Sequence, residues 1–259
     1  MELPTNRLKA ALARGELQTG LWLTLADPAV AEIAGRAGFD WCLIDGEHGP
    51  NTPTTIQAQL QALEAAGCPA VVRVAANDPV RLKLALDLGA QSVLVPLVDT
   101  AEEAAAAVAA CRYPPRGMRG MGAAVARASY WGAVGDYAAR ADGEICVIVQ
   151  AESRRALARV AEIAAVEGVD GVFIGPADLS ADMGHPGAPD HPEVRAAIEA
   201  GLGAIAAAGA APGIIAFDPE AAAGYARLGA RFLGLGADAA ALSGALRRLS
   251  AAARAALAP

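Results

Sequence analysis

The chain alternates between short apolar runs and longer segments with apolar residues at helical spacing. The apolar runs lack polar alternation, which indicates strands covered on both faces. We predict eight strands, over Gly20–Ala26, Trp41–Ile44, Ala70–Val74, Ser92–Val98, Ile145–Gln150, Gly171–Gly175, Gly213–Phe217 and Arg231–Gly236. Helical spacing predicts a lead-in helix over Asn6–Arg14 and further helices over Pro28–Ala37, Thr54–Ala66, Pro79–Leu88, Ala101–Cys111, Arg154–Ala165, Glu193–Ala208, Pro219–Leu228 and Ala239–Leu257.

Strands and helices that alternate throughout imply a parallel sheet. Eight such units in 259 residues favour one (β/α)8 TIM-type barrel domain, residues 1–259, over an open doubly wound sheet. An open sheet that binds a dinucleotide would carry a GxGxxG turn after its first strand, but that strand here leads into Asp27-Pro28. The one irregular stretch, residues 113–142, is predicted to be a long functional loop.

The composition limits the partners of the protein. A net charge of -7 and a pI near 5.0 offer nucleic-acid phosphates no attractive surface. No apolar run approaches the roughly 20 residues that cross a bilayer, and the N-terminus lacks a signal pattern. We therefore expect a soluble, cytoplasmic protein without nucleic-acid or membrane partners. The four cysteines form no CxxC motif and are expected to be buried thiols.

Ionisable and polar residues follow several of the predicted strands. In a barrel of this type the carboxyl ends of the strands meet at one mouth, where active groups lie. The residues expected there are Asp45, Glu47 and His48 after the second strand, Arg73 on the third, Gln150 and Glu152 on the fifth, and Asp178 after the sixth. For the second-strand group alone, a polar turn with an incidental histidine is the alternative.

Glu152 and Asp178 follow adjacent strands, about 4.8 Å apart, so their carboxylates could share one cation. Oxygen ligands favour Mg²⁺, Mn²⁺ or Co²⁺ over structural zinc. An ion with open positions could chelate a 2-oxo acid through its carboxylate and ketone oxygens, while the backbone N–H groups of Ala177 and Asp178 could hold a substrate carboxylate. The alternatives are that each carboxylate caps a helix and that the turn at Ala177 is ordinary.

Arg73 needs an anion, which could be a substrate oxygen or an internal partner, Asp45 or Glu47. Asp87 stands at the C-terminal end of a predicted helix, where the helix dipole disfavours a carboxylate. It precedes the fourth strand and so lies at the rim opposite the mouth. Asp87 is therefore either a solvated acid near Lys83 or a group that serves His48 of a neighbouring subunit.

His185 and His191 lie in a Pro/Gly-rich loop. We see no carboxylate at ligand spacing and interpret both as loop residues.

Four motifs, taken together, resemble the HpcH/HpaI family of class II pyruvate aldolases. They are Leu43-Ile-Asp-Gly-Glu-His48, Tyr113-Pro-Pro-Arg-Gly-Met-Arg-Gly120, Val149-Gln-Ala-Glu152 and Gly168-Val-Asp-Gly-Val-Phe-Ile-Gly-Pro-Ala-Asp-Leu-Ser180. The resemblance implies a TIM-type barrel, a divalent metal without an organic cofactor, pyruvate as the donor and an aldehyde as the acceptor. It also implies a homo-hexamer, a trimer of dimers, with exchanged C-terminal helices.

The resemblance also implies roles by motif position. His48 would be the base, Arg73 would stabilise the transition state, and Asp87 would raise the basicity of the histidine. Our own mechanistic hypothesis is that a neighbouring acid, Asp87 or Asp45, orients the ring of this base. The metal ligands would be Glu152 and Asp178, and the donor contacts would be Gln150 and the backbone around Ala177. The sequence Gln-Ala-Glu-Ser around Glu152 departs from the bulkier apolar residue and the threonine expected there.

The acceptor aldehyde is not specified by the sequence. Its selectivity is expected to depend on side chains such as Trp22 and Ile215. The two lysines, Lys9 and Lys83, lie on predicted helices, which argues against a Schiff-base aldolase.

Two other functions stay open. An acyl-CoA lyase of the citrate-lyase β type would need a basic surface for the CoA phosphates, for which Arg112, Arg116 and Arg119 are candidates. A non-catalytic oligomeric 2-oxo acid binding protein would not need His48.

Overall fold

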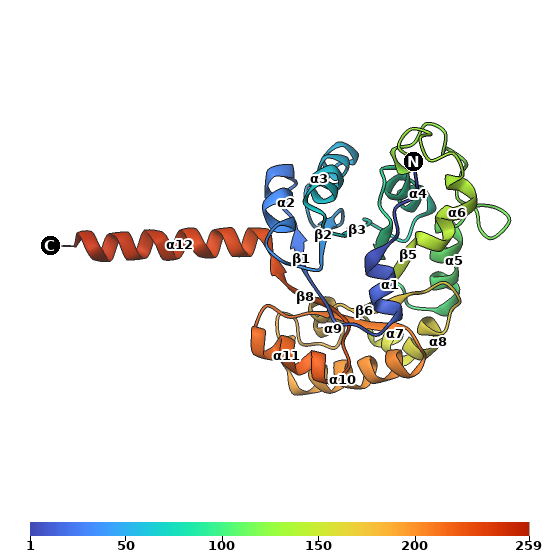
Figure 1. The fold of residues 1–259 in the computed structure, drawn as a ribbon. Coiled ribbons are helices and arrows are strands. Elements are labelled where there is room, and N and C mark those ends of the chain that lie inside the picture. The colour runs from blue at the N-terminus through green and yellow to red at the C-terminus, as the bar shows by residue number, and fades with distance from the viewer. Residues whose placement is uncertain (259) are drawn as a thin grey trace.

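Eight parallel strands form a closed barrel in sequence order in the computed structural model, which describes residues 1–258 (Figure 1). The strands are β1 Gln18–Leu23, β2 Trp41–Asp45, β3 Ala70–Arg73, β4 Ser92–Val95, β5 Cys146–Ala151, β6 Gly171–Ile174, β7 Ala211–Ile215 and β8 Phe232–Ala237. β8 pairs with β1 and closes the sheet. The predicted (β/α)8 barrel is confirmed.

Helices surround the barrel (Figure 1). Their bounds are α1 Arg7–Ala13, α2 Pro28–Gly35, α3 Pro53–Ala66, α4 Pro79–Asp87, α5 Ala101–Cys111, η1 Arg127–Ser129, α6 Tyr137–Glu144, α7 Arg154–Ala158, α8 Val160–Ala164, α9 Pro176–Asp182, α10 Pro192–Ala207, α11 Pro219–Arg227 and α12 Asp238–Leu257. Several begin with proline directly after a capping side chain, which satisfies free N–H groups and presets the first turn. These caps are Asp27, Thr52, Asp78 and Asp218.

The interior of the barrel is filled by aromatic side chains. Trp41 stacks on Phe232 with ring centroids 4.0 Å apart, and Trp22 meets Trp41 edge-on at 5.4 Å. A Cβ at Gly20 would lie 2.1 Å from the Trp41 ring, and one at Gly234 would lie 2.4 Å from Trp22. The two indoles therefore fit because glycine stands on the strands beside them.

Several element boundaries differ from the predictions. β1 and β4 end earlier than expected, and Ala26 and Leu97 beyond them have a left-handed backbone with φ of 56°. The helix predicted over 154–165 is divided into α7 and α8 at Arg159. The stretch expected to be a loop contains η1 and the start of α6, and the expected turn after β6 is the helix α9. Short helices in these connections lack the apolar periodicity that reveals longer ones.

α12 extends away from the barrel as a long single helix (Figure 1). Asp238 is its one buried residue in the described chain, and four of its leucines are exposed: Leu242, Leu246, Leu249 and Leu257. None of the helices described is long and apolar enough to cross a membrane. The four cysteines are buried and free, as predicted.

Candidate active site

Asp45 and Arg73 form the centre of the cluster at the carboxyl ends of the strands. They are direct neighbours in the register of β2 and β3. Arg73 donates through Nε to Asp45 Oδ1 at 2.9 Å and through Nη2 to Oδ2 at 2.6 Å. The same carboxylate accepts the backbone N–H groups of Glu47 and His48, at 3.0 and 3.2 Å. Asp45 thus shapes the turn after β2 and holds the guanidinium.

Arg73 has a second acidic partner. Its Nη1 lies 2.9 Å from Glu47 Oε2 in an ion pair. Burial raises the pKa of Glu47, and the charge of Arg73 opposes that rise. The predicted internal pairing of Arg73 is confirmed, with both acids at once. Arg73 makes hydrogen bonds only to Asp45 in the described chain, through Nε and Nη2, so other N–H groups of the guanidinium are left for a further acceptor.

The ring of His48 is open to solvent in the isolated chain, with 67% of the side chain exposed. Its Nε2 lies 3.9 Å from Glu47 Oε2. Asp45 contacts the backbone of His48, and its two oxygens are engaged with Arg73. Within the described chain, the acid beside this ring is therefore Glu47.

Glu152 is the buried acid of the site, with 4% of the residue exposed. Its Oε1 accepts the backbone N–H of Leu97 at 2.9 Å, which the left-handed turn after β4 directs inward, and Gln150 Nε2 donates to Oε2. Burial raises the pKa of Glu152 to about 7, with further contributions from the charges of Asp178 and Glu47. A Cβ at Gly175 would lie 2.6 Å from Glu152 Oε2, so glycine is needed there.

Asp178 stands in the first turn of α9 and is exposed. Gly175 is the N-cap of α9, and Ser153 caps α7. The alternative in which Asp178 and Glu152 act as helix caps is therefore wrong. No protein hydrogen bond or ion pair to the Asp178 carboxylate is found among residues 1–258.

The donor set of this mouth fits a hard divalent cation. The Glu47 and Asp178 charges both raise the pKa of Glu152, so the three carboxylates lie close enough to interact, and of the three only Glu47 is paired with Arg73. Gln150 Oε1 is buried and has no hydrogen-bond partner in the described chain. Oxygen donors of this kind are the preferred ligands of Mg²⁺ and Mn²⁺. Glu152, Asp178 and their neighbours are therefore the candidate metal ligands.

The residues expected to touch substrate lie at different depths. Trp22 is 5% exposed and belongs to the barrel interior, and Ile215, on β7, packs against the same cluster. Ala177 is exposed at the start of α9. Trp22 is first a core residue, and its effect on aldehyde choice stays a prediction.

Asp87 has a partner that the sequence interpretation did not name. Its Oδ1 accepts from Arg119 Nη2 at 2.7 Å, and the Arg119 side chain is 0% exposed. The guanidinium lies 4.5 Å from the ring centroid of Tyr113. The motif of residues 113–120 thus folds back to neutralise the carboxylate at the end of α4. A solvated acid near Lys83 is not what the structure contains.

The burial of arginine side chains in this region also reduces the basic surface that was expected to bind CoA phosphates. Arg112 is 8% exposed and Arg119 is 1% exposed, so only Arg116 of the three arginines faces solvent freely.

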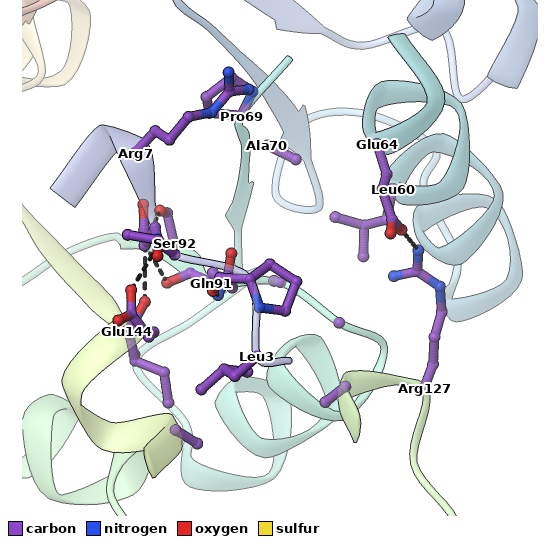
Figure 2. A pocket seen from close by; sticks show the side chains of 18 of the residues that line it. Leu3, Arg7, Leu60, Glu64, Pro69, Ala70, Gln91, Ser92, Arg127 and Glu144 are labelled. Atoms are coloured by element: carbon purple, nitrogen blue, oxygen red, sulfur yellow. Dashed lines mark hydrogen bonds and ion pairs between the residues drawn. The ribbon is translucent and has the colours of Figure 1, made fainter. Parts of the chain in front are cut away.

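A cavity of about 210 Å³ lies elsewhere, beside α1 and the segments that lead into β3 and β4 (Figure 2). Its charged groups have internal partners: Arg127 pairs with Glu64, and Glu144 accepts the backbone N–H of Asn6. The cavity is therefore separate from the polar mouth.

His185 lies in the loop after α9, as predicted, but the expectation that it has no carboxylate at ligand spacing is wrong. Its Nε2 lies 3.0 Å from Glu193 Oε2. The two residues are eight positions apart in the sequence, which does not by itself indicate a contact. They meet because the loop between α9 and α10 brings His185 back to the first turn of α10.

Residues 18–245 match the HpcH/HpaI aldolase/citrate lyase family. The chain is 52% identical over 250 residues to the hydroxypyruvate/pyruvate aldolase of Pseudomonas aeruginosa, covering 96% of this chain and 93% of the relative. It is also 52% identical to the 4-hydroxy-2-oxo-heptane-1,7-dioate aldolase of Shigella sonnei, over 95% of this chain and 94% of the relative.

Solved structures agree in fold. An HpcH/HpaI aldolase/citrate lyase family protein from Burkholderia cenocepacia J2315 has a TM-score of 0.93 and 42% identity, covering 96% of this chain and 100% of its own. A citrate lyase beta subunit from M. tuberculosis, with a TM-score of 0.59, 19% identity and coverage of 86% and 92%, shares the fold alone. With its barrel and its strand-end acids in place, the chain belongs to the HpcH/HpaI aldolase/citrate lyase family.

Proposed function

We propose that this chain is a class II pyruvate aldolase. It would add pyruvate, or a close 2-oxo acid, to an aldehyde to give a 4-hydroxy-2-oxo acid, and cleave the product in reverse. The observation that carries the proposal is the buried carboxylate of Glu152, which has two charged acids near it and a raised pKa. The two aldolases that are 52% identical over nearly the whole chain support the same activity.

Glu152 and Asp178 would hold the divalent ion, Mg²⁺, Mn²⁺ or Co²⁺. Such an ion, when bound, polarises a ketone and acidifies the neighbouring methyl group. Gln150 is buried at the same strand end, where its amide would contact the donor. The N–H groups at Ala177 and Asp178 lie in the first turn of α9, where backbone donors favour a carboxylate.

His48 would remove the methyl proton of the donor, and Arg73 would face the negative charge that develops. Arg73 is suited to this because its ion pairs with Asp45 and Glu47 hold it in place, while it still has N–H groups that make no hydrogen bond within the described chain. The open ring of His48 would be covered in an oligomer. There Asp87 of a neighbouring subunit would orient the ring.

Exchange of pyruvate methyl protons in D2O, followed by NMR, tests the assignment. His48→Ala should slow the exchange at least about 100-fold, because general base catalysis contributes 10²–10⁴-fold. The control Glu32→Gln, on the solvent face of α2, should keep the full rate. EDTA should abolish exchange, and borohydride with pyruvate should leave the protein active. Inactivation by borohydride would contradict the metal-dependent route.

The alternatives predict different outcomes. A non-catalytic 2-oxo acid binding protein would bind pyruvate without proton exchange. An acyl-CoA lyase would cleave a CoA thioester, but two of its three candidate arginines are buried.

We also propose that α12 packs on a neighbouring subunit of a homo-oligomer, with a hexamer as the expected assembly. The support is the exposed leucine stripe on a helix that leaves the barrel (Figure 1). Leu246→Glu with Leu249→Glu should yield monomers in light scattering. Ala251→Glu, about 180° around the helix from Leu242, should keep the assembly. An unchanged mass for the double variant would contradict this arrangement.

A further inference from the structure

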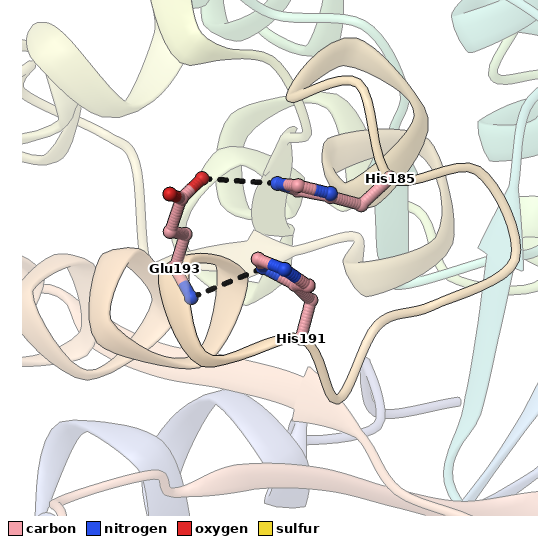
Figure 3. A group of neighbouring side chains, drawn as sticks. All are labelled: His185, His191 and Glu193. Atoms are coloured by element: carbon pink, nitrogen blue, oxygen red, sulfur yellow. Dashed lines mark hydrogen bonds and ion pairs between the residues drawn. The ribbon is translucent and has the colours of Figure 1, made fainter.

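Two histidines and a glutamate gather between α9 and α10, outside the candidate active site (Figure 3). His185 lies in the loop after α9, His191 is the N-cap residue of α10, and Glu193 stands in the first turn of that helix. One possible ligand atom from each residue lies within 4.8 Å of those of the other two. The proposed aldol chemistry uses none of these residues, so the cluster calls for its own explanation.

The three side chains already hold one another. His185 Nε2 lies 3.0 Å from Glu193 Oε2, and the two imidazole rings are stacked with centroids 3.5 Å apart (Figure 3). His191 Nδ1 accepts the backbone N–H of Glu193 at 3.3 Å. The Glu193 side chain therefore lies beside both imidazoles, and each of the three residues offers a possible ligand atom.

We propose that His185, His191 and Glu193 form a second metal site, for an ion that prefers imidazole, Zn²⁺ above all. Two imidazoles and one carboxylate are a common ligand set for zinc, with a fourth position left to water. The oxygen donors at the barrel mouth favour harder ions such as Mg²⁺ and Mn²⁺. The two sites therefore differ in the chemistry of their ligands as well as in position.

The side chains have room to close around an ion. Zinc binds nitrogen at about 2.0–2.1 Å, so the ligand atoms must move closer together than they are now. Because the nitrogen lone pairs lie in the ring planes, coordination tilts the two rings out of their stack. The Glu193 side chain is 70% exposed and can turn towards an ion, and the His185 side chain is partly accessible, with 24% exposed.

A bound ion would connect the loop after α9 to the first turn of α10. α9 also carries Asp178 in its first turn. Coordination would therefore restrain α9, the short helix that carries Asp178, a candidate metal ligand of the active site. The expected effect is a higher melting temperature with zinc, since a ligand that binds only the folded state stabilises it.

Zinc titration of metal-stripped protein tests the site directly. Glu152→Gln removes a ligand at the mouth, and this variant should bind one Zn²⁺ per chain by calorimetry. Adding His185→Phe should weaken that binding at least tenfold. His191→Asn, which keeps a capping side chain, should do the same without loss of the helix. Zinc should raise the melting temperature of Glu152→Gln but not of either double variant.

Copper provides a spectroscopic readout that is independent of activity. The chain has three histidines, so His48→Ala leaves only this pair. Its Cu²⁺ electron paramagnetic resonance spectrum should show coupling to two nitrogens, and adding His185→Phe should remove one. Equal zinc affinity of Glu152→Gln with and without His185→Phe would overturn the proposal, as would a copper spectrum of His48→Ala without two nitrogens. Neither result depends on whether the protein is an aldolase.

Discussion

The raised pKa of Glu152 makes metal binding at the mouth depend on pH in the neutral range. A carboxyl with a pKa of about 7 is about 90% ionised at pH 8 and about 10% ionised at pH 6. Since the ion binds the ionised form, the dissociation constant for Mn²⁺ should rise about tenfold between pH 8 and pH 6. An ordinary glutamate would change it by only a few per cent over the same range.

Calorimetric titration of metal-stripped protein with Mn²⁺ at pH 6, 7 and 8 measures this effect. Glu152→Gln should bind Mn²⁺ much more weakly at every pH. An affinity for the unmodified protein that changes less than twofold from pH 8 to pH 6 would refute the reasoning, because Glu152 would then be ionised throughout.

The stability of the metal-free protein should follow the same group. The pKa of Glu152 is about 7 in the folded state, above its ordinary value of 4.5. At a pH between these two values, folding is therefore accompanied by the uptake of a proton. The folded state is therefore favoured as the pH falls through 7, by about 1 kcal/mol between pH 8 and pH 6. Glu152→Gln should remove this dependence in urea unfolding and raise stability at pH 8 by up to about 3 kcal/mol.

Three further experiments test the packing and the ion pairs. Asp45→Asn breaks a buried bidentate pair and should cost about 3 kcal/mol of unfolding free energy, whereas Glu32→Gln, in an exposed pair, should cost less than about 0.5 kcal/mol. Arg119→Met and Asp87→Asn should be non-additive in a double-mutant cycle by at least about 1 kcal/mol, and additivity would exclude a direct interaction. Gly234→Ala forces a Cβ to 2.4 Å from an indole ring and should lower the melting temperature by the equivalent of about 1–3 kcal/mol; an unchanged value would contradict that packing.

Much of the barrel could be read from the sequence because buried parallel strands are continuous apolar runs. The carboxyl ends of such strands share one rim, so Asp45, Arg73 and Glu152 could be assigned to a common mouth before any coordinates were known. The pairing of Arg73 with Asp45 follows from the register of β2 and β3, and the sequence interpretation named it as one of two options.

The conformations of the loops and short helices between the strands could not be predicted in this way, because they depend on tertiary contacts that no local sequence pattern indicates. The sequence marked Asp87 as misplaced at a helix end, but its partner Arg119 lies 32 residues away in a segment without regular periodicity. The Glu193 carboxylate beside His185 was missed for the same reason.

The sequence by itself determined the order of the strands, the rim on which the acids lie and the absence of a strand-end lysine, since these depend on hydrophobic period and residue type. Tertiary structure alone decided which charges touch and how deeply each is buried. The raised pKa of Glu152 shows the reason: desolvation is set by everything that packs around a carboxylate, and those neighbours come from four different strands and their loops.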